Sequence, residues 1–352
     1  MRSATRWAAP ILVALAMAAC SGGAGGDDGE DHWIVSLLQR IPGMAPGTIE
    51  VSVADLPAAA AAAGIPVPPA GAGDEAVADY LLGLPRDVLV PDLLRDPAPR
   101  FGDLTRELGI DPSRVLQAIT AGTAPETYQA LRGDFDAAAI DAAVRADPVW
   151  SDLLATADYR DVGYYTWGED FATNLDRVTP VRPLGRGGRL GLDGQFLYWA
   201  PWTAGMEGLI DAGAGAVASL ADDLSLARAA RALEEAGVYS ATLTDRPLGP
   251  DAEVSALALG VGGGRDEAGA FWAMVAVHNS GAAAEEAAAA VRSILGEGTI
   301  ASLGRPWSER VSSFTVTVDG DLLVAVVHSS GAEGDWMRAY QTREPLVLAA
   351  QT

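Results

Sequence analysis

Hydrophobic and polar positions alternate along much of the chain, and this alternation predicts β-strands. In "TIEVSVADL", Ile49, Val51 and Val53 alternate with Glu50 and Ser52. Because successive side chains of a strand point to opposite faces, the pattern is typical of a half-buried strand. Alternating or continuous apolar runs predict further strands or hairpins at 127–135, 159–168, 188–200, 237–246, 253–262, 269–279 and 310–329.

A second periodicity, with apolar residues three and four positions apart, predicts helices. In "HWIVSLLQRI", Ile34, Leu37, Leu38 and Ile41 share one helical face. Capping residues and stop signals mark further helices at 136–146 after Asp136, at 222–236 between Asp222 and Gly237, and at 111–122 between Asp111 and Gly122. The remaining helices are expected within 57–73, near 202–212, at 281–295 and at 336–342.

The order of these elements recurs. Residues 237–246 stand in the second half of the chain where 47–56 stand in the first, and each half reads strand, strand, helix, strand, strand, helix. The sequence therefore predicts an internally duplicated α+β fold, with a mainly antiparallel sheet and helices on one face. We expect a first half at 32–212, with a helical insertion at about 74–122, and a second half at 213–348, packed together as one body.

The N-terminal segment has the three parts of a secretory signal peptide. Arg2 and Arg6 precede an apolar run from residue 7 to residue 18, and small residues follow. Met17-Ala18-Ala19-Cys20 then resembles the lipobox of bacterial lipoproteins, with methionine where leucine is usual. The resemblance implies that residues 1–19 are removed and that Cys20 receives a diacylglyceryl group with palmitate-type chains. An ordinary cleaved signal, with Cys20 incidental, is the alternative.

The lipobox reading predicts a protein anchored to a cell membrane by its N-terminal lipid and facing outside the cytoplasm. Residues 20–31 are rich in glycine and aspartate, so we expect a flexible acidic tether. A metal site that uses Asp27, Asp28, Glu30, Asp31 and His32 is the less favoured interpretation of this segment, since it has no apolar residue to fold around.

The charge of the chain excludes one class of partner. The formal net charge is −23, and removal of residues 1–19, which hold two arginines and no acids, gives −23 − 2 = −25. Such a chain repels polyanions, so nucleic acid is not an expected partner. The expected partners are the membrane, through the lipid, and either a cell-surface protein or an apolar small molecule.

One segment of the body resembles a known family. "SLADDLSLARAARALEEAGVYSATLTD" at 219–245 is similar to a helix-to-strand segment of uncharacterised bacterial proteins of the DUF3352 type, which are duplicated α+β proteins often attached to membranes. The resemblance covers about thirty residues and implies no chemistry.

Motifs of catalysis are few. The chain has three histidines, and His278 and His328 fall at the ends of predicted strands. No Gly-x-Ser-x-Gly elbow and no cluster of cysteine and histidine at zinc-ligand spacing occurs, so no catalytic residue, metal or cofactor is expected. The glycine-rich 260–269 leads into another strand and is interpreted as a hairpin loop rather than a phosphate loop.

Aromatic residues give the remaining candidates for a binding site. Trp167, Trp199 and Trp202 fall at the ends of predicted strands, where amphipathic rings can line a ligand pocket; packing in the core is the alternative. Glu169 and Asp170 beside tyrosines resemble a sugar-binding platform, but adjacent strand residues point to opposite faces.

Three classes of function follow from these residues. A non-enzymatic lipoprotein that binds a partner is favoured. A carrier of an apolar small molecule, held between the sheet and the helices, is the alternative, and a carbohydrate-active or other hydrolase is disfavoured.

Overall fold

The computed structural model describes residues 32–98, 100–249, 252–263, 269–329 and 332–352. These residues form one compact unit. The predicted signal peptide at 1–19, lipid attachment at Cys20 and the tether at 20–31 lie outside the described residues.

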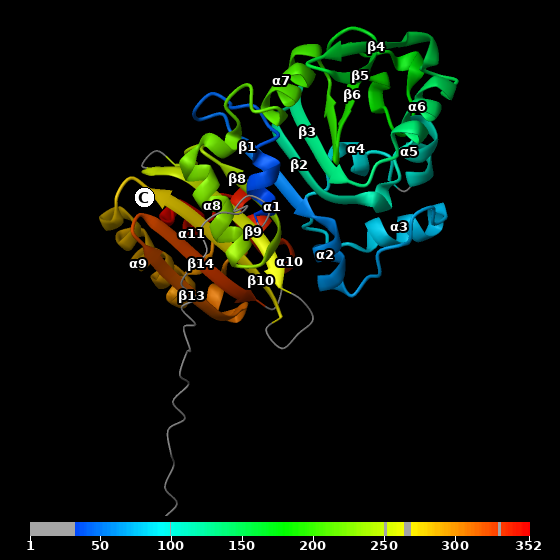
Figure 1. Ribbon diagram of the computed structural model, residues 1–352. Helices are drawn as coiled ribbons and strands as arrows, with labels where there is room; N and C mark the ends of the chain where they lie inside the picture. Colours follow the sequence, from blue (N-terminus) through cyan, green and yellow to red (C-terminus); the bar gives the residue numbers. More distant parts are fainter. Residues whose placement is uncertain (1–31, 99, 250–251, 264–268, 330–331) are drawn as a thin grey trace, which may run out of the picture. The chain divides into compact units, whose positions relative to one another are not determined.

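Twelve strands form one antiparallel sheet in the order β13-β14-β10-β9-β8-β1-β2-β3-β7-β6-β5-β4 (Figure 1). Their bounds are β1 Glu50–Asp55, β2 Val115–Thr123, β3 Glu126–Gly133, β4 Leu154–Tyr159, β5 Val162–Trp167, β6 Gly188–Asp193, β7 Phe196–Ala200, β8 Val238–Thr244, β9 Val254–Gly263, β10 Ala270–His278, β13 Val311–Asp319 and β14 Leu322–Ser329. A separate pair is formed by β11 Thr299–Ile300 and β12 Arg305–Pro306. The predicted α+β class with a mainly antiparallel sheet is confirmed.

Helices cover both faces of this sheet, which corrects the expectation of helices on one face. The first face carries α2 Leu56–Ala63, α3 Asp74–Gly83, α4 Asp92–Arg95, α5 Phe101–Leu108, α6 Ala137–Ala146, α9 Gly281–Glu297, α10 Ala332–Gln341 and α11 Pro345–Ala349. The second face carries α1 Trp33–Leu38, α7 Thr203–Gly213 and α8 Leu224–Glu235, and Figure 1 shows α8 lying over β8 to β10.

The burial of the central strands explains why two layers of helices are needed. Every residue of β8 is buried, and along β10 Trp272 and Met274 pack into the core of the first face while Ala273 and Val275 pack into that of the second. Alternating apolar side chains on both faces leave no face for solvent. A continuous apolar run in a strand therefore indicates that both faces of the sheet are covered at that strand.

The two halves of the chain have the same strand order. Strands β1-β2-β3-β7-β6 in one half correspond to β8-β9-β10-β14-β13 in the other, and β5 with β4 extend the first half. Helices α6 and α9 follow the third strand of each half on the first face, but α7 lies on the second face and α10 on the first. The duplication therefore stays a prediction, and the closing helices do not correspond.

The halves meet where β1 pairs with β8. Along this seam the hydroxyls of Ser240 and Thr242 donate to backbone carbonyls of β1, and that of Thr244 donates to the carbonyl of Ile49, just before β1. The oxygen–oxygen distances to Val53, Val51 and Ile49 are 3.2, 3.0 and 2.7 Å. These polar side chains are thus satisfied inside the sheet, as buried hydroxyls must be to avoid a desolvation cost.

The predicted helix at 111–122 is wrong. Asp111 does act as a cap, accepting from the Ser113 N–H at 3.0 Å, but the helix is a single 3-10 turn at Pro112–Arg114. The chain then continues as β2, which pairs with both β1 and β3. Tertiary pairing and the β-branched residues of this segment outweigh the local capping signal. The helical insertion therefore ends before β2.

Two smaller predictions also change. Strand β4 was not expected; it joins β5 through a turn at Arg160 and Asp161, both with positive φ. Helix α8 is capped by Asp223, which accepts from two backbone N–H groups, while Asp222 closes a capping box with Ser219 in the preceding 3-10 turn.

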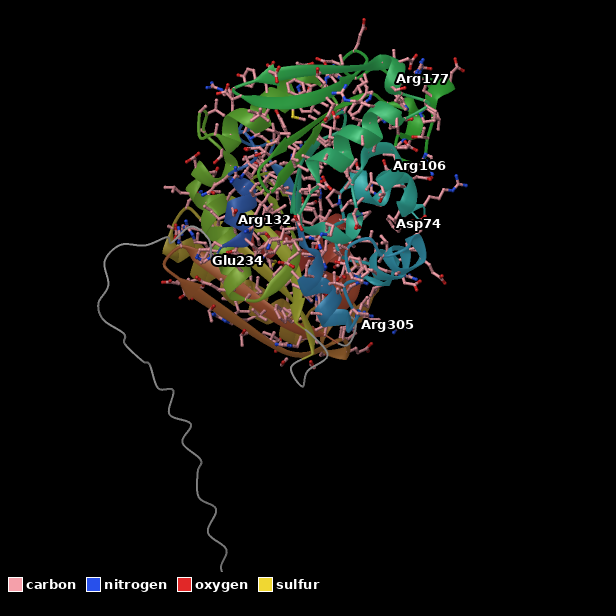
Figure 2. The ribbon with its side chains drawn as sticks, turned by 45° about the vertical axis from the view of Figure 1, so that its right-hand side comes forward. Asp74, Arg106, Arg132, Arg177, Glu234 and Arg305 are labelled. Carbon is pink, nitrogen blue, oxygen red and sulfur yellow. The ribbon has the colours of Figure 1, made fainter. Side chains whose placement is uncertain are left out.

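Helix α1 is hydrogen-bonded to helix α8 of the second half. Glu234 of α8 accepts from the backbone N–H groups of Ile34 and Val35 and bonds His32 Nδ1 at 2.5 Å, and Figure 2 shows Glu234 beside α1. His32 therefore belongs to the body, whereas Asp27, Asp28, Glu30 and Asp31 of the alternative metal site lie outside the described residues. Among the described residues, no helix has the length and apolar character needed to cross a membrane.

Candidate ligand-binding cavity

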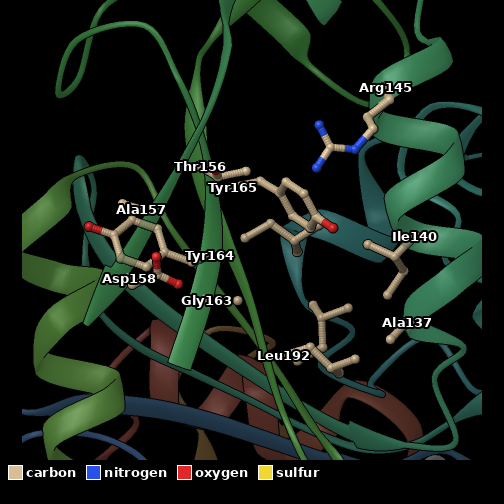
Figure 3. Close-up of a pocket in the computed structure, with 13 residues that line it drawn as sticks. Ala137, Ile140, Arg145, Thr156, Ala157, Asp158, Gly163, Tyr164, Tyr165 and Leu192 are labelled. Carbon is tan, nitrogen blue, oxygen red and sulfur yellow. The ribbon is translucent and has the colours of Figure 1, made fainter. Parts of the chain in front are cut away.

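A cavity of about 310 Å³ lies between α6 and the strands β4, β5 and β6 on the first face of the sheet (Figure 3). Its apolar wall is formed by Ile140 of α6 and Leu190, Leu192 and Leu197 of β6 and β7. Polar groups line the rest, among them Arg145, Thr156 and Asp158. The volume is at the lower end of the range of about 300–1,000 Å³ that is typical of small-molecule sites.

Small residues create this space. Gly163 lies two positions before Tyr165, so both face α6, and a Cβ added at Gly163 would come within 4 Å of only one atom, Asp158 Oδ1 at 3.4 Å. On the helix, Ala137 stands one turn before Ile140. A missing side chain on the strand and a methyl group on the helix therefore leave the cavity open.

A polar bridge crosses one side of the cavity. The Tyr165 hydroxyl donates to Asp141 of α6 at 2.8 Å, and Asp141 also accepts from Arg145 at 2.8 Å. Burial and the neighbouring carboxylate raise the pKa of Tyr165 to about 12, so its proton is retained at neutral pH. The hydrogen bond from Tyr165 lowers the pKa of Asp141. The bridge links β5 to α6.

The three tryptophans singled out in the sequence do not share one site. Trp167 is fully buried, with its ring centre 6.2 Å from that of Tyr165 and 6.4 Å from that of Trp199. Trp199 lines a second, smaller cleft on the first face. Trp202 packs with the second face, its ring centre 4.8 Å from that of Tyr128. The 310 Å³ cavity is lined by none of them.

Arg182 is the neighbour of Trp167 that sequence reasoning missed. Its guanidinium carbon lies 4.1 Å from the ring centre of Trp167 and 4.6 Å from that of Trp150, so the side chain is held between two indole faces. Arg182 is 1% exposed. No local motif marks this residue, because Trp150, Trp167 and Arg182 lie 17 and 15 residues apart and show no common spacing.

Of the acidic pair Glu169 and Asp170, Asp170 has a structural role. Asp170 accepts from the backbone N–H of Thr203 at 2.9 Å and lies 2.6 Å from an Arg189 nitrogen. It therefore caps the start of α7. Glu169 is exposed beside it.

The histidines at the strand ends lie apart. His328 pairs with Phe271 at the start of β10, whereas His278 is the last residue of β10. The hairpin interpretation of 260–269 is consistent with the pairing of β9 with β10, although 264–268 lie outside the described residues.

Comparisons with known proteins give a distant match only. Two solved structures of the Treponema protein TP0453, in crystal forms III and I, align with TM-scores of 0.39 and 0.38 and 10% sequence identity. The alignments cover 86% and 84% of this chain and 97% and 93% of TP0453. No protein-family model and no curated protein matches the chain.

Proposed function

We propose that this chain is a lipid-anchored, non-enzymatic binding protein outside the cytoplasm that carries a small apolar molecule in the cavity between α6 and β4–β6. The observation that supports the proposal is the combination of an apolar wall and open volume in one place. Anchoring through Cys20 rests on the Met17–Cys20 pattern of the sequence.

The cavity chemistry favours a ligand with an apolar body. Leu192 is partly exposed in the cavity wall, so a ligand that covers it buries apolar surface without displacing a polar partner. Arg145, Thr156 and Asp158 stand where a polar group of the ligand would meet solvent. The sequence alone favours binding of a partner protein, but binding at a surface does not require the open volume of this cavity.

A cavity-filling substitution tests the proposal. Gly163→Leu places a branched side chain where only Asp158 Oδ1 is near, and Gly163 has no positive φ that a side chain would strain. We expect the affinity for the uncharged probe N-phenyl-1-naphthylamine, measured by fluorescence titration, to fall at least about 10-fold, because the probe loses the volume that it occupies.

Gly296→Leu is the matched control, since Gly296 lies in α9 with nothing within 4 Å of an added Cβ. It should bind the probe as the unchanged protein does. Equal affinity in Gly163→Leu and Gly296→Leu would overturn the proposed site. Native mass spectrometry of the protein purified from its own host then identifies the carried molecule by a mass that disappears on denaturation.

A further inference from the structure

The Arg182 side chain is buried without hydrogen-bond partners. Among the described residues, Nε and both Nη atoms of Arg182 have no acceptor, and the indole N–H groups of Trp150 and Trp167 have none either. A guanidinium carries five N–H donors and no acceptor. The cluster therefore holds a concentration of buried donors.

Such a group is costly unless something accepts its hydrogen bonds. An unpaired buried donor loses its hydration without compensation, and the loss is greater for a charged group. Stacking on the indole faces offsets part of this cost through the cation–π interaction, but it occupies the faces of the guanidinium and leaves the N–H groups at its edge unpaired. The edge is where an acceptor has to lie.

The nearby carboxylates do not supply that acceptor. Asp147 and Glu107 help to keep Arg182 protonated, while burial, the larger effect, lowers the pKa of Arg182 to about 10. Neither forms an ion pair with Arg182 within 4.0 Å in the described part of the chain. Glu107 instead accepts from the Thr179 hydroxyl at 2.7 Å. Asp147 accepts from the Val149 N–H at 2.9 Å through Oδ1, and its buried Oδ2 has no donor among the described residues.

A cleft is lined in part by Arg182, whose guanidinium nitrogens have almost no accessible surface. It has a volume of about 90 Å³ and is also lined by Gln129, Arg186 and Trp199. Arg186 is exposed and adds positive charge at the entrance, where Asp92 and Asp96 add negative charge. The space suits one small polar group and is much smaller than the cavity beside α6.

We propose that Arg182 is the anchor of an oxyanion site, in which a carboxylate or phosphate group enters the cleft, displaces the side chains that cover the guanidinium, and accepts hydrogen bonds from its N–H edge. A planar guanidinium presents paired N–H groups that match two oxygens of such an anion. The two indole rings hold the guanidinium in place before the ligand arrives, which lowers the entropy cost of binding.

The proposal is tested with three probes on the purified protein. Sodium octanoate, sodium phosphate and uncharged 1-octanol are titrated at constant ionic strength, and the melting temperature and tryptophan fluorescence are followed. We expect a saturable rise in melting temperature with at least one anion. A response to octanoate alone identifies a carboxylate site, and a response to phosphate alone identifies a phosphate site.

Arg182→Gln should weaken the binding of the responding anion at least about 10-fold, because it removes the charged donors. Arg305→Gln is the matched control, because Arg305 (labelled in Figure 2) is exposed in β12 and does not line the cleft. If Arg182→Gln does not fold, the exposed Arg186→Glu serves instead, and its affinity for the anion should fall at least about 3-fold as the local charge is reversed.

Three results would overturn the inference: no saturable response to either anion, equal binding by Arg182→Gln, or equal binding by Arg186→Glu where that variant decides. The binding of N-phenyl-1-naphthylamine and its sensitivity to Gly163→Leu are measured separately, so the cavity proposal stands or fails independently of Arg182.

Discussion

His278 is a buried histidine whose protonation opposes folding. It is 2% exposed, and in the described structure neither ring nitrogen has a hydrogen-bond partner. Burial lowers the pKa of His278, and the charges of Asp321 and Glu253 only partly oppose that effect. Asp321 is itself engaged with Arg228 at 2.6 Å.

Stability should therefore fall as the solution is acidified below the ordinary histidine pKa of 6.5. In that range the unfolded chain binds a proton at this position and the folded chain does not, so protons favour unfolding; above pH 6.5 both states are neutral and the effect disappears. Urea unfolding at a series of pH values measures this dependence.

His278→Leu replaces the titrating imidazole with an apolar side chain of similar length. Its free energy of unfolding should fall less steeply between pH 6.5 and pH 5 than that of the unchanged protein. Identical slopes in the two proteins would show that His278 does not contribute to the dependence.

At the scale of elements, the attachment of α1 to α8 depends on one carboxylate. Helix α1 has only six residues and no cap from its own preceding side chain. Glu234, with its side chain 6% exposed, takes that role from a helix about 200 residues later in the sequence. A short helix gains its stability from such tertiary contacts rather than from its own length.

Glu234→Ala should lower the free energy of unfolding by about 2 kcal/mol, because two backbone donors and His32 lose a charged acceptor. Chemical denaturation measures the loss. The neighbouring Glu235→Ala, at an exposed position of the same helix, should change stability by less than about 0.5 kcal/mol. Similar losses in both variants would contradict the capping role of Glu234.

Most elements could be predicted from the sequence because their signals are local. Alternation marks β1, and Asp136 with its capping bonds marks α6. The helix predicted at 111–122 is wrong because Asp111 and Pro112 are local signals, whereas the pairing of β2 with β1 and β3 depends on residues far away.

The candidate site could be predicted less well. The cavity depends on Gly163 and Ile140, from a strand and a helix whose contact no local pattern encodes. A glycine inside the alternating "VGYYTW" was the one signal available, because glycine in a strand often marks a close approach or open space. For Arg182 there was no signal, since Trp150 and Trp167 meet it only in the folded chain.

At the scale of the whole molecule, the seam between β1 and β8 joins the two halves into one sheet. All seven residues of β8 are buried, and three of its hydroxyls donate to carbonyls of residues 49–53. Removal of either half would expose a long edge with unpaired N–H and C=O groups.

Residues 213–352, produced without the first half, should therefore fail to form a folded monomer. Size-exclusion chromatography with light scattering, together with circular dichroism, should show an unfolded chain or an oligomer that pairs through β8. A folded, monomeric fragment would mean that each half is an independent domain.

The seam also determines how slowly the chain can fold. Ser240 and Val53, which it joins, are 187 residues apart in the sequence, and pairing of such distant segments carries a large loop-closure entropy that slows folding. A chain synthesised from its N-terminus completes β1 and β2 long before β8 exists, so the half with the cavity waits with one strand edge open. During that interval the nascent chain depends on chaperones, or on rapid completion of synthesis, to avoid aggregation.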